Sequence, residues 1–483
     1  MLKKIIVILS VFAISLFPMV GSVSAQQAEG TLPGFGEGYA TSLGQEYFLG
    51  RVWLMSFRRQ APIISDPLMQ EYVEDLLYNL VATSELKDRR LELVLVNHPS
   101  INAFAVPGGV VGVHNGLLDK ATTEAQFASV LTHELAHVSQ RHFARSREAA
   151  KNTSVIQLAG LLTGALLAVT DGGSSAVAAV MGTQAAAMQS KLRFSRLHEQ
   201  EADRIGMKNM VRANMNPMGA EEMFKIMQTV SRSYGGRPPE FLMTHPLTET
   251  RISDARNRSR EYPRKIYTEN LEYQLMRARV ALRFAGESDK AVAMFREKLA
   301  KSGINAEPNQ YGLVLALTEN GDYAEAKKLL SPLLEYSPSS MIYGIAEAEI
   351  YIAEGNQEKA LELLQRGLTL VPDNHPITMT LAEAHVKFGD HHKAAALLEK
   401  HAKTRAKDPA VWYQLAESQG QSGNTLGVHQ ARAEYFALTG QPIRAKKQLG
   451  FAMQLPNLDE LTRTRLRERI MQIEQLEIAM RNF

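Results

Sequence analysis

Hydrophobic positions follow two different periods in the first part of this chain. Apolar residues recur at helical spacing over 39–59, and a second helical pattern begins at Asp66, an N-cap residue followed by Pro67. Residues 91–96 form a continuous block rich in Leu and Val, which is typical of a strand. These patterns predict two packing helices that lead into a small sheet.

A hairpin is predicted directly after this strand. Residues 101–106 and 110–113 flank a Pro-Gly-Gly turn, in which Gly108 or Gly109 would supply the positive φ. An exposed edge strand can hold an extended peptide by backbone pairing, although a purely structural hairpin is an equal alternative. The residues of this candidate substrate edge are Asn102, Ala103, Phe104 and Ala105.

Two further regions of helical periodicity follow the hairpin. The first runs from about 126 to 147 and begins after a capping box formed by Thr123 and Gln126. The second, 149–189, contains an apolar stretch over 155–169 that is too short for a comfortable membrane span. We expect 149–189 to be either a mobile helical hairpin that gates the site or lies against a membrane or partner, or two tightly packed helices.

From residue 270 onward the helical pattern repeats with a period of 34 or 35 residues. Glycines mark this period, and an alanine follows five residues after each of the first four: Gly286, Gly321, Gly355, Gly389, Gly423, and Ala291, Ala326, Ala360, Ala394. Prolines at 338, 372 and 409 follow the same period less strictly and are expected at the repeat ends. This spacing is that of tetratricopeptide repeats, which stack into a solenoid with a concave groove for peptides or protein partners. The histidines of this half are expected at the surface or in the groove: His375, His385, His391, His392, His401 and His429.

Composition narrows the function classes. The net charge of +3 over 483 residues, with basic and acidic residues mixed along the helices, gives no sign of nucleic-acid binding. Lys3 and Lys4, an apolar run over 5–20 and small residues up to Ala25 predict a signal peptide at 1–25. The absence of cysteine excludes disulfides, thiolate metal ligands and a cysteine nucleophile. We therefore expect an exported protein of the bacterial periplasm.

The run from about 126 to 147 contains His133-Glu134-Leu135-Ala136-His137, on which the functional interpretation depends. Histidines four apart lie on one face of a helix, so both imidazoles can bind one Zn²⁺. Glu134 would lie beside the open coordination position as general base for a metal-bound water. The alternative is a pair of surface histidines on an amphipathic helix.

A later helix, expected to begin at Ser195 as its N-cap, supplies candidates for a third ligand. Glu199 and Asp203 are four apart and share a face, so Glu199 could bind the metal while Asp203 accepts a hydrogen bond from a zinc-bound histidine. Glu201 and His198 are the competing ligands, but both project from other faces. We therefore expect Glu199 to complete the ligand set.

Three more polar residues accompany these motifs. His142 would lie about 140° from His137 on a continuous helix, so it is a poor ligand and is expected at the surface or behind the site. His245 precedes Pro246 in a loop and is expected to reach the open metal position, either to polarise the substrate carbonyl or to take the place of water in a latent state. Arg251 would stabilise the oxyanion or anchor the loop. The alternative for His245 is a solvated loop histidine.

Four motifs together resemble the M48 family of zinc metalloproteases: His-Glu-x-x-His at 133–137, Ser-Arg-x-x-Glu-x-x-Ala-Asp at 195–203, Asn-Ala-Phe-Ala at 102–105 and Thr-His-Pro at 244–246. The resemblance covers residues from about 40 to 262. It implies one Zn²⁺ per chain, zinc ligation by His133, His137 and Glu199, Glu134 as general base and Asp203 behind the ligands. It also favours an active-site role for His245.

The expected fold is mainly α. A signal peptide at 1–25 precedes an α+β zincin-like metalloprotease domain with a small sheet at 26–265, and an all-α tetratricopeptide solenoid follows at 266–483. A secreted M48 protease with such repeats resembles the periplasmic proteases of outer-membrane protein quality control. This implies unfolded or misassembled outer-membrane proteins as clients, and contact of the repeats with the barrel-assembly machinery. The alternative is a non-proteolytic binding or chaperone module with a latent or structural zinc site.

Overall fold

The computed structural model describes residues 42–149, 196–233, 239–303 and 306–481. The expected signal peptide, the expected N-cap Ser195 and all of the 149–189 segment except Ala149 lie outside these residues. Among the described residues, no helix combines the length and the apolar character needed to span a bilayer.

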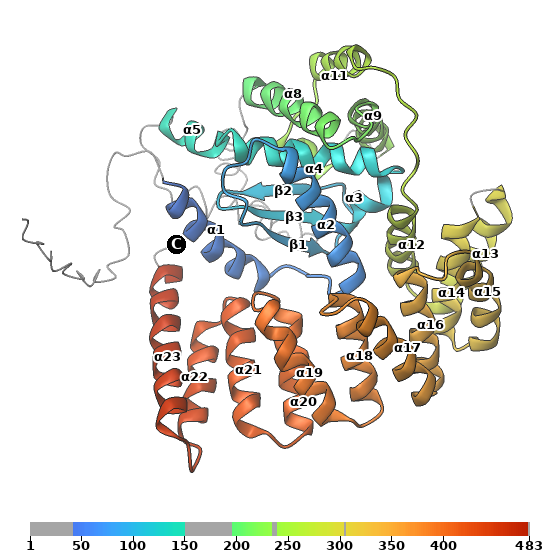
Figure 1. Cartoon of the computed structure of the whole chain (residues 1–483). Helices are drawn as coiled ribbons and strands as arrows, with labels where there is room; N and C mark the ends of the chain where they lie inside the picture. Colours follow the sequence, from blue (N-terminus) through green and yellow to red (C-terminus); the bar gives the residue numbers. More distant parts are fainter. Residues whose placement is uncertain (1–41, 150–195, 234–238, 304–305, 482–483) are drawn as a thin grey trace, which may run out of the picture. The chain divides into compact units, whose positions relative to one another are not determined.

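A three-stranded mixed sheet lies at the centre of the first half (Figure 1). Its strands are β1 (Glu92–Val96), β2 (Ala103–Val106) and β3 (Val110–His114), in the order β1-β3-β2. Strand β3 pairs parallel with β1 and antiparallel with β2, so the predicted strand and hairpin are confirmed. Gly108 and Gly109 both have positive φ, at 86° and 80°. Strand β2 is therefore an edge of the described sheet.

Helices cover both faces of this sheet. They are α1 (Leu43–Arg58), α2 (Pro67–Thr83), α3 (Asn115–Lys120) and α4 (Glu124–Ser139). On one face, Trp53 and Phe57 of α1 form a core cluster with Phe104 and alternate residues of β1. The other face joins the main core, which α2 and α4 share. The sheet thereby fixes α4 directly beside β2.

Helix α4 begins with the predicted capping box, in which Thr123 and Gln126 bond each other's backbone. The continuous helix expected from 126 to 147 is wrong, however. Helix α4 ends at Ser139, and Arg141 adopts a left-handed φ of 51° before α5 (His142–Ala149) begins. This break redirects the chain immediately after the histidine pair.

Four more helices complete this half. They are α8 (Arg196–Arg212), α9 (Met218–Ser233), α10 (Glu240–Thr244) and α11 (Glu249–Glu261). Helices α8 and α9 pack on α4, α11 packs on α8 and α9, and α10 lies against the start of β2. Gly206 of α8 permits a close approach to α4, because a Cβ there would lie only 3.1 Å from the Thr132 carbonyl carbon and from His133 N. The backbones of α4 and α8 thus touch beside the first histidine.

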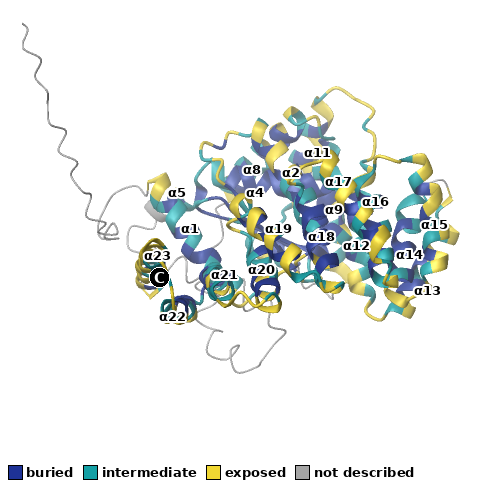
Figure 2. Cartoon of the chain, turned by 60° about the horizontal axis from the view of Figure 1, so that its bottom comes forward, coloured by how far each residue is buried: buried dark blue, intermediate teal, exposed yellow. Residues whose placement is uncertain are grey.

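The second half is an array of paired helices that continues to Arg481. It confirms the expected tetratricopeptide-like solenoid. Its helices are α12 (Leu271–Ala285), α13 (Ser288–Lys301), α14 (Glu307–Asn320), α15 (Tyr323–Tyr336), α16 (Met341–Glu354), α17 (Gln357–Leu370), α18 (His375–Lys387), α19 (His391–Thr404), α20 (Pro409–Gln421), α21 (Thr425–Leu438), α22 (Pro442–Met453) and α23 (Glu460–Arg481). Each of the five periodic glycines has positive φ, between 78° and 88°, and the four periodic alanines are fully buried. Buried and exposed residues alternate along the repeat helices (Figure 2).

Two expectations for the repeats are corrected. Pro409 is the first residue of α20, where its missing N–H costs nothing, and does not mark a repeat end. His375 and His385 of α18 and His401 of α19 are buried, because the stacked helices of the solenoid enclose them. His375 Nδ1 lies 2.9 Å from His401 Nε2, and these two rings stack.

Candidate metal centre

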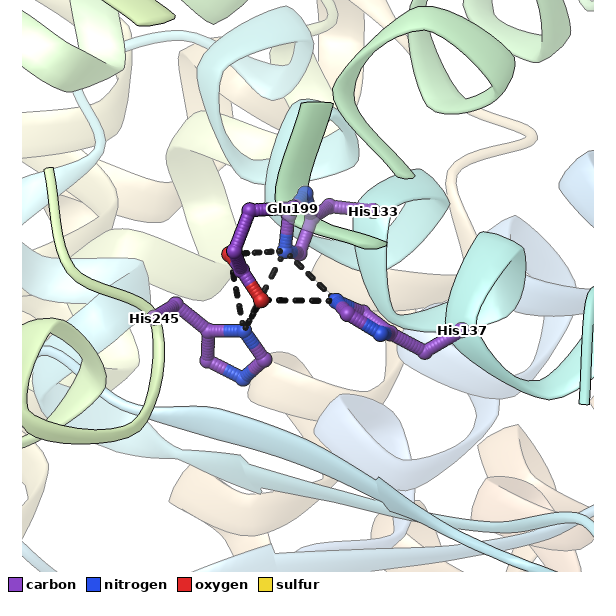
Figure 3. Close-up of side chains that lie close together, drawn as sticks. All are labelled: His133, His137, Glu199 and His245. Carbon is purple, nitrogen blue, oxygen red and sulfur yellow. Dashed lines mark hydrogen bonds and ion pairs between the residues drawn. The ribbon is translucent and has the colours of Figure 1, made fainter. Parts of the chain in front are cut away.

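Four buried side chains from three parts of the chain converge at one point (Figure 3). Helix α4 supplies His133 and His137, α8 supplies Glu199, and His245 is the C-cap residue of α10. One donor atom from each lies within 4.8 Å of all the others. His133 Nε2 is 3.0 Å from His137 Nε2 and 3.3 Å from His245 Nδ1, and His245 Nδ1 is 3.1 Å from Glu199 Oε1.

The donor set fits a metal ion. Three ring nitrogens face one another, and unprotonated nitrogens at such distances repel unless a proton or a cation lies between them. His133 Nδ1 is already engaged by Asp203 Oδ1 at 2.9 Å, which leaves its Nε2 to face the cluster. Imidazole nitrogen and carboxylate oxygen are the ligands that Zn²⁺ takes in the absence of cysteine. The residues expected as ligands are therefore together, with His245 as a fourth donor.

Asp203 links the cluster to Arg251. Its carboxylate accepts hydrogen bonds from Arg251 Nε at 2.6 Å and Nη2 at 2.7 Å, in addition to its contact with His133. Arg251 Nη1 lies 3.0 Å from Glu199 Oε2 and donates to the Pro246 carbonyl at 2.9 Å. The buried guanidinium thus holds two carboxylates and the loop of His245, which corresponds to the anchoring alternative for Arg251.

Glu134 lies beside the donors in a fixed orientation. Its Oε2 accepts a hydrogen bond of 3.0 Å from the backbone N–H of Ala105 in β2. Its Oε1 is 3.4 Å from His245 Nε2 and has no hydrogen-bond partner among the described residues. Burial raises the pKa of Glu134, and the nearby His245 only partly offsets this. One carboxylate oxygen is anchored, and the other faces the site.

Burial and the neighbouring charges shift the pKa values of the cluster residues in different directions. Burial alone would raise the pKa of Glu199, but His245 and His133 hold it well below its usual range. Burial alone would lower the pKa of His133, but its bonds to Asp203 and Glu199 raise it to about 9. Burial, with His133 and His245 close by, holds the pKa of His137 well below its usual range. His133 therefore holds a proton before any metal binds, and a metal ion would displace that proton.

Strand β2 lies next to Glu134. His114 N donates to the Asn102 carbonyl, so by the alternation of an antiparallel pair the backbone groups of Ala103 and Ala105 face the open edge. Glu134 takes the Ala105 N–H. The Phe104 ring lies over Gly112 and meets Trp53 and Phe57 of α1 edge-on, on the face of the sheet that α1 covers. Of the expected edge residues, the two alanines present their backbone at the site and Phe104 belongs to the core.

The helix that carries His245 is bonded to the start of β2. Phe241 N donates to the Ile101 carbonyl at 3.3 Å, and Asn102 Nδ2 donates to Glu240 Oε2 at 3.1 Å. Glu240 also meets His114 in a second cluster with His98, in which the Ser100 hydroxyl lies between 2.7 and 2.9 Å from all three side chains. These bonds hold α10, and with it His245, against the edge strand.

Of the two positions expected for His142, the surface is wrong and the place behind the site is the one that the structure shows. The left-handed turn at Arg141 brings its ring under His137, where His142 Nδ1 lies 2.8 Å from His137 Nδ1. The competing ligand Glu201 contacts His142 Nε2 at 3.2 Å instead of the cluster, and the His198 ring stacks on His142. On a continuous helix the spacing of five would keep His142 away from His137, so the contact between the two rings depends on the helix break at Arg141.

The fold and the donor cluster define a metallopeptidase: two histidines one turn apart on a helix, a carboxylate from a second helix and a glutamate beside them. The sequence profile of Peptidase family M48 matches residues 67–259, and a profile of the tetratricopeptide repeat matches residues 351–417.

Comparison with curated proteins narrows this class. The chain is 32% identical to the beta-barrel assembly-enhancing protease of Escherichia coli (strain K12) over 479 residues, which are 99% of this chain and 97% of the relative. It is 30% identical to the Yersinia pestis protein of the same name, over 96% and 97% of the two chains. The mitochondrial metalloendopeptidase OMA1 of Schizosaccharomyces pombe is 33% identical over 38% of this chain and 50% of that one. This chain belongs to peptidase family M48, in the group of the beta-barrel assembly-enhancing proteases, which confirms the expected family.

Proposed function

We propose that this chain is a zinc metalloendopeptidase that acts on outer-membrane β-barrel proteins. The observation that carries the proposal is the cluster of three imidazole nitrogens and one carboxylate with the Glu134 carboxylate beside it. His133, His137 and Glu199 are the proposed protein ligands, and Asp203 orients His133 from behind. Family M48 membership supports the metalloprotease class, and the donor set supports zinc.

The proposed mechanism is hydrolysis of a peptide bond by water. Bound at this site, Zn²⁺ would supply Lewis-acid polarisation of the scissile carbonyl and lower the pKa of a bound water to about 7. Glu134 Oε1 then takes the proton of the attacking water and returns it to the leaving amine, while Oε2 stays fixed on the Ala105 N–H. The raised pKa of Glu134 suits a group that must both accept and release a proton.

His245 is proposed to be a latch. Its Nδ1 lies among the donors, where a fourth ligand would take the place of water, and its Nε2 faces Glu134 Oε1. Bonds from Arg251 to the loop and from Phe241 to β2 hold it there. In this arrangement the site is closed, and activity requires His245 to leave. The alternative role, polarisation of the substrate carbonyl, requires His245 outside the donor cluster.

Clients and partners are proposed from the fold and the relatives. An extended client would pair with the open edge at Ala103 and Ala105, which favours β-rich clients that are unfolded or misassembled. The repeats are proposed to contact the client or the barrel-assembly machinery. A cavity of about 500 Å³ between the last repeats, lined among others by Trp412, Glu434 and Arg469, supports this role. The periplasmic location is proposed from the signal-peptide pattern of 1–25 and the bacterial relatives.

Substitution of Glu134 by Gln tests the enzyme. The variant should bind one zinc per chain as the wild type does but lose at least about 100-fold in cleavage of casein or a misassembled barrel protein, because it lacks the general base. Cleavage at the wild-type rate would refute the proposal.

A second function is favoured by the fourth donor. Four protein ligands are typical of a structural zinc site, so the chain could instead be a chaperone module without proteolysis. That alternative predicts that Glu134→Gln fully retains barrel-assembly activity in cells and that the wild type cleaves no client. X-ray absorption of the zinc-loaded protein, with and without client, measures whether the fourth ligand leaves.

A further inference from the structure

The end of the histidine helix has an unusual backbone turn. Arg141 is a non-glycine residue with φ of 51°, a strained conformation that residues with a Cβ rarely adopt. Its guanidinium bonds Glu46 Oε1 of α1 at 2.8 Å, which helps to hold the turn. The result is that His142 folds back under α4 with no exposed surface. Because this backbone strain lies next to the donor cluster, the contact that it creates for His142 is a candidate for a functional role.

The turn creates a chain of contacts that begins at the donor cluster. His137 directs Nε2 at the other donors and Nδ1 at His142 Nδ1, 2.8 Å away. His142 Nε2 lies 3.2 Å from Glu201 Oε2, and Arg145 Nη1 donates to the same oxygen at 2.9 Å. The His198 ring stacks on His142, with centroids 4.4 Å apart and planes inclined by 11°.

Donor and acceptor chemistry assigns the protons along this chain. A carboxylate only accepts hydrogen bonds, so His142 Nε2 carries the proton that it donates to Glu201. The Nδ1 of that neutral ring is then an acceptor, and the 2.8 Å contact requires His137 Nδ1 to donate. His137 Nε2 is left with its lone pair directed at the donor cluster, which is the tautomer that a metal ligand needs.

We infer that His142 is a positioning residue for zinc binding, which sets the tautomer and orientation of His137 through the Glu201–Arg145 pair. The two ligand histidines would then be oriented by different chemistry, His133 by the Asp203 carboxylate and His137 by an imidazole backed by a carboxylate. The inference rests on the proposed zinc site but not on proteolysis. A partner behind a metal-bound histidine is worth about 10- to 100-fold in metal affinity.

Three variants of the full-length chain separate positioning from packing. His142→Phe keeps a ring on His198 but removes both nitrogens. His142→Asn places an amide oxygen near the position of Nδ1 and can still accept from His137. His392→Asn, at an exposed histidine of α19, is the matched control. The measurements are zinc affinity by competition with a chelator, the visible spectrum of the Co²⁺-substituted protein, and the melting temperature of the metal-free protein.

We expect His142→Phe to bind zinc about 10- to 100-fold more weakly and to change the Co²⁺ spectrum, at an unchanged metal-free melting temperature. His142→Asn should recover most of the affinity and the wild-type spectrum. Wild-type affinity and spectrum in His142→Phe would overturn the inference, as would an equal loss in both variants. Failure of the wild type itself to bind zinc would instead refute the proposed function.

Discussion

The pair of Arg251 and Asp203 distinguishes a structural from a catalytic role for the arginine. Both side chains are largely buried, and two short hydrogen bonds join the guanidinium to the carboxylate. The same guanidinium contacts Glu199 Oε2 at 3.0 Å. Substitution of Arg251 by Met keeps most of the side-chain volume but leaves two buried carboxylates without their cation.

The size of the effect follows from this burial. Removing one partner of a buried ion pair costs about 3–5 kcal/mol. Adding Asp203→Asn removes one of the stranded charges and keeps an oxygen that can accept from His133 Nδ1. We therefore expect Arg251→Met alone to be less stable than the double variant, with a coupling free energy of about 2 kcal/mol, within the range of residues in contact.

The assay is chemical denaturation of EDTA-treated wild type, Arg251→Met, Asp203→Asn and the double variant, with a zinc titration of each. If Arg251 anchors the site, both single variants lower zinc affinity by about 10- to 100-fold and the double variant is no worse. If Arg251 stabilised the oxyanion, Arg251→Met would keep its stability and zinc affinity and lose only turnover. Additive losses of stability would also refute the reasoning.

Three further predictions concern the latch, the helix contact and the repeats. His245→Ala should raise cleavage of casein several-fold by opening the fourth donor position, and unchanged cleavage would leave His245 a structural loop residue. Gly206→Val should lower stability by about 1–3 kcal/mol and weaken zinc binding, because the valine side chain must push α8 away from the backbone of Thr132 and His133. Denaturation and zinc titration measure the two effects, and Gly206→Ala, with its smaller side chain, should show a smaller loss of both. Burial, with Arg405 nearby, lowers the pKa of His401 to about 4. As the pH falls from 7 to 5, the His401 ring therefore stays neutral in the folded state, whereas in the unfolded state it takes up a proton near pH 6.5. Wild type should therefore lose about 1 kcal/mol more stability than His401→Gln between pH 7 and pH 5, since solvent screening reduces the full value of about 2; parallel losses in the two proteins would contradict this.

Helical spacing alone was enough to predict that the donors of each helix share one face. His133 and His137 are one turn apart, and Glu199 and Asp203 repeat that spacing on α8, so each helix presents a matched pair to the other. Gly206 permits the close packing of these helices, and a glycine at that position is visible in the sequence. Local periodicity determines such pairs because both members lie on one rigid element.

Other parts of the site depend on tertiary contacts that no local pattern contains. The left-handed turn at Arg141 occurs at a residue type that rarely adopts it, so the sequence reads as continuous helix. The place of His245 follows from the docking of α10 on β2, through bonds between segments about 140 residues apart. The burial of His401 likewise follows from the stacking of adjacent repeats, not from its own helix.

The proposed boundary at 265–266 divides two sequence patterns, but the contacts across it join the residues on either side into one compact unit. Tyr273 of α12 is fully buried and donates to the Ala121 carbonyl at 2.9 Å, in the loop that leads into α4. Asn270 donates to Glu124, the first residue of α4, at 2.7 Å. Arg279 of the same helix pairs at 3.0 Å with Asp66, the N-cap of α2. The first repeat helix therefore holds the beginnings of α2 and α4, and α4 carries the two histidines of the donor cluster. A partner that shifts the first repeat would strain the start of α4, whereas a partner on the last repeats would act on the site only through the intervening helices.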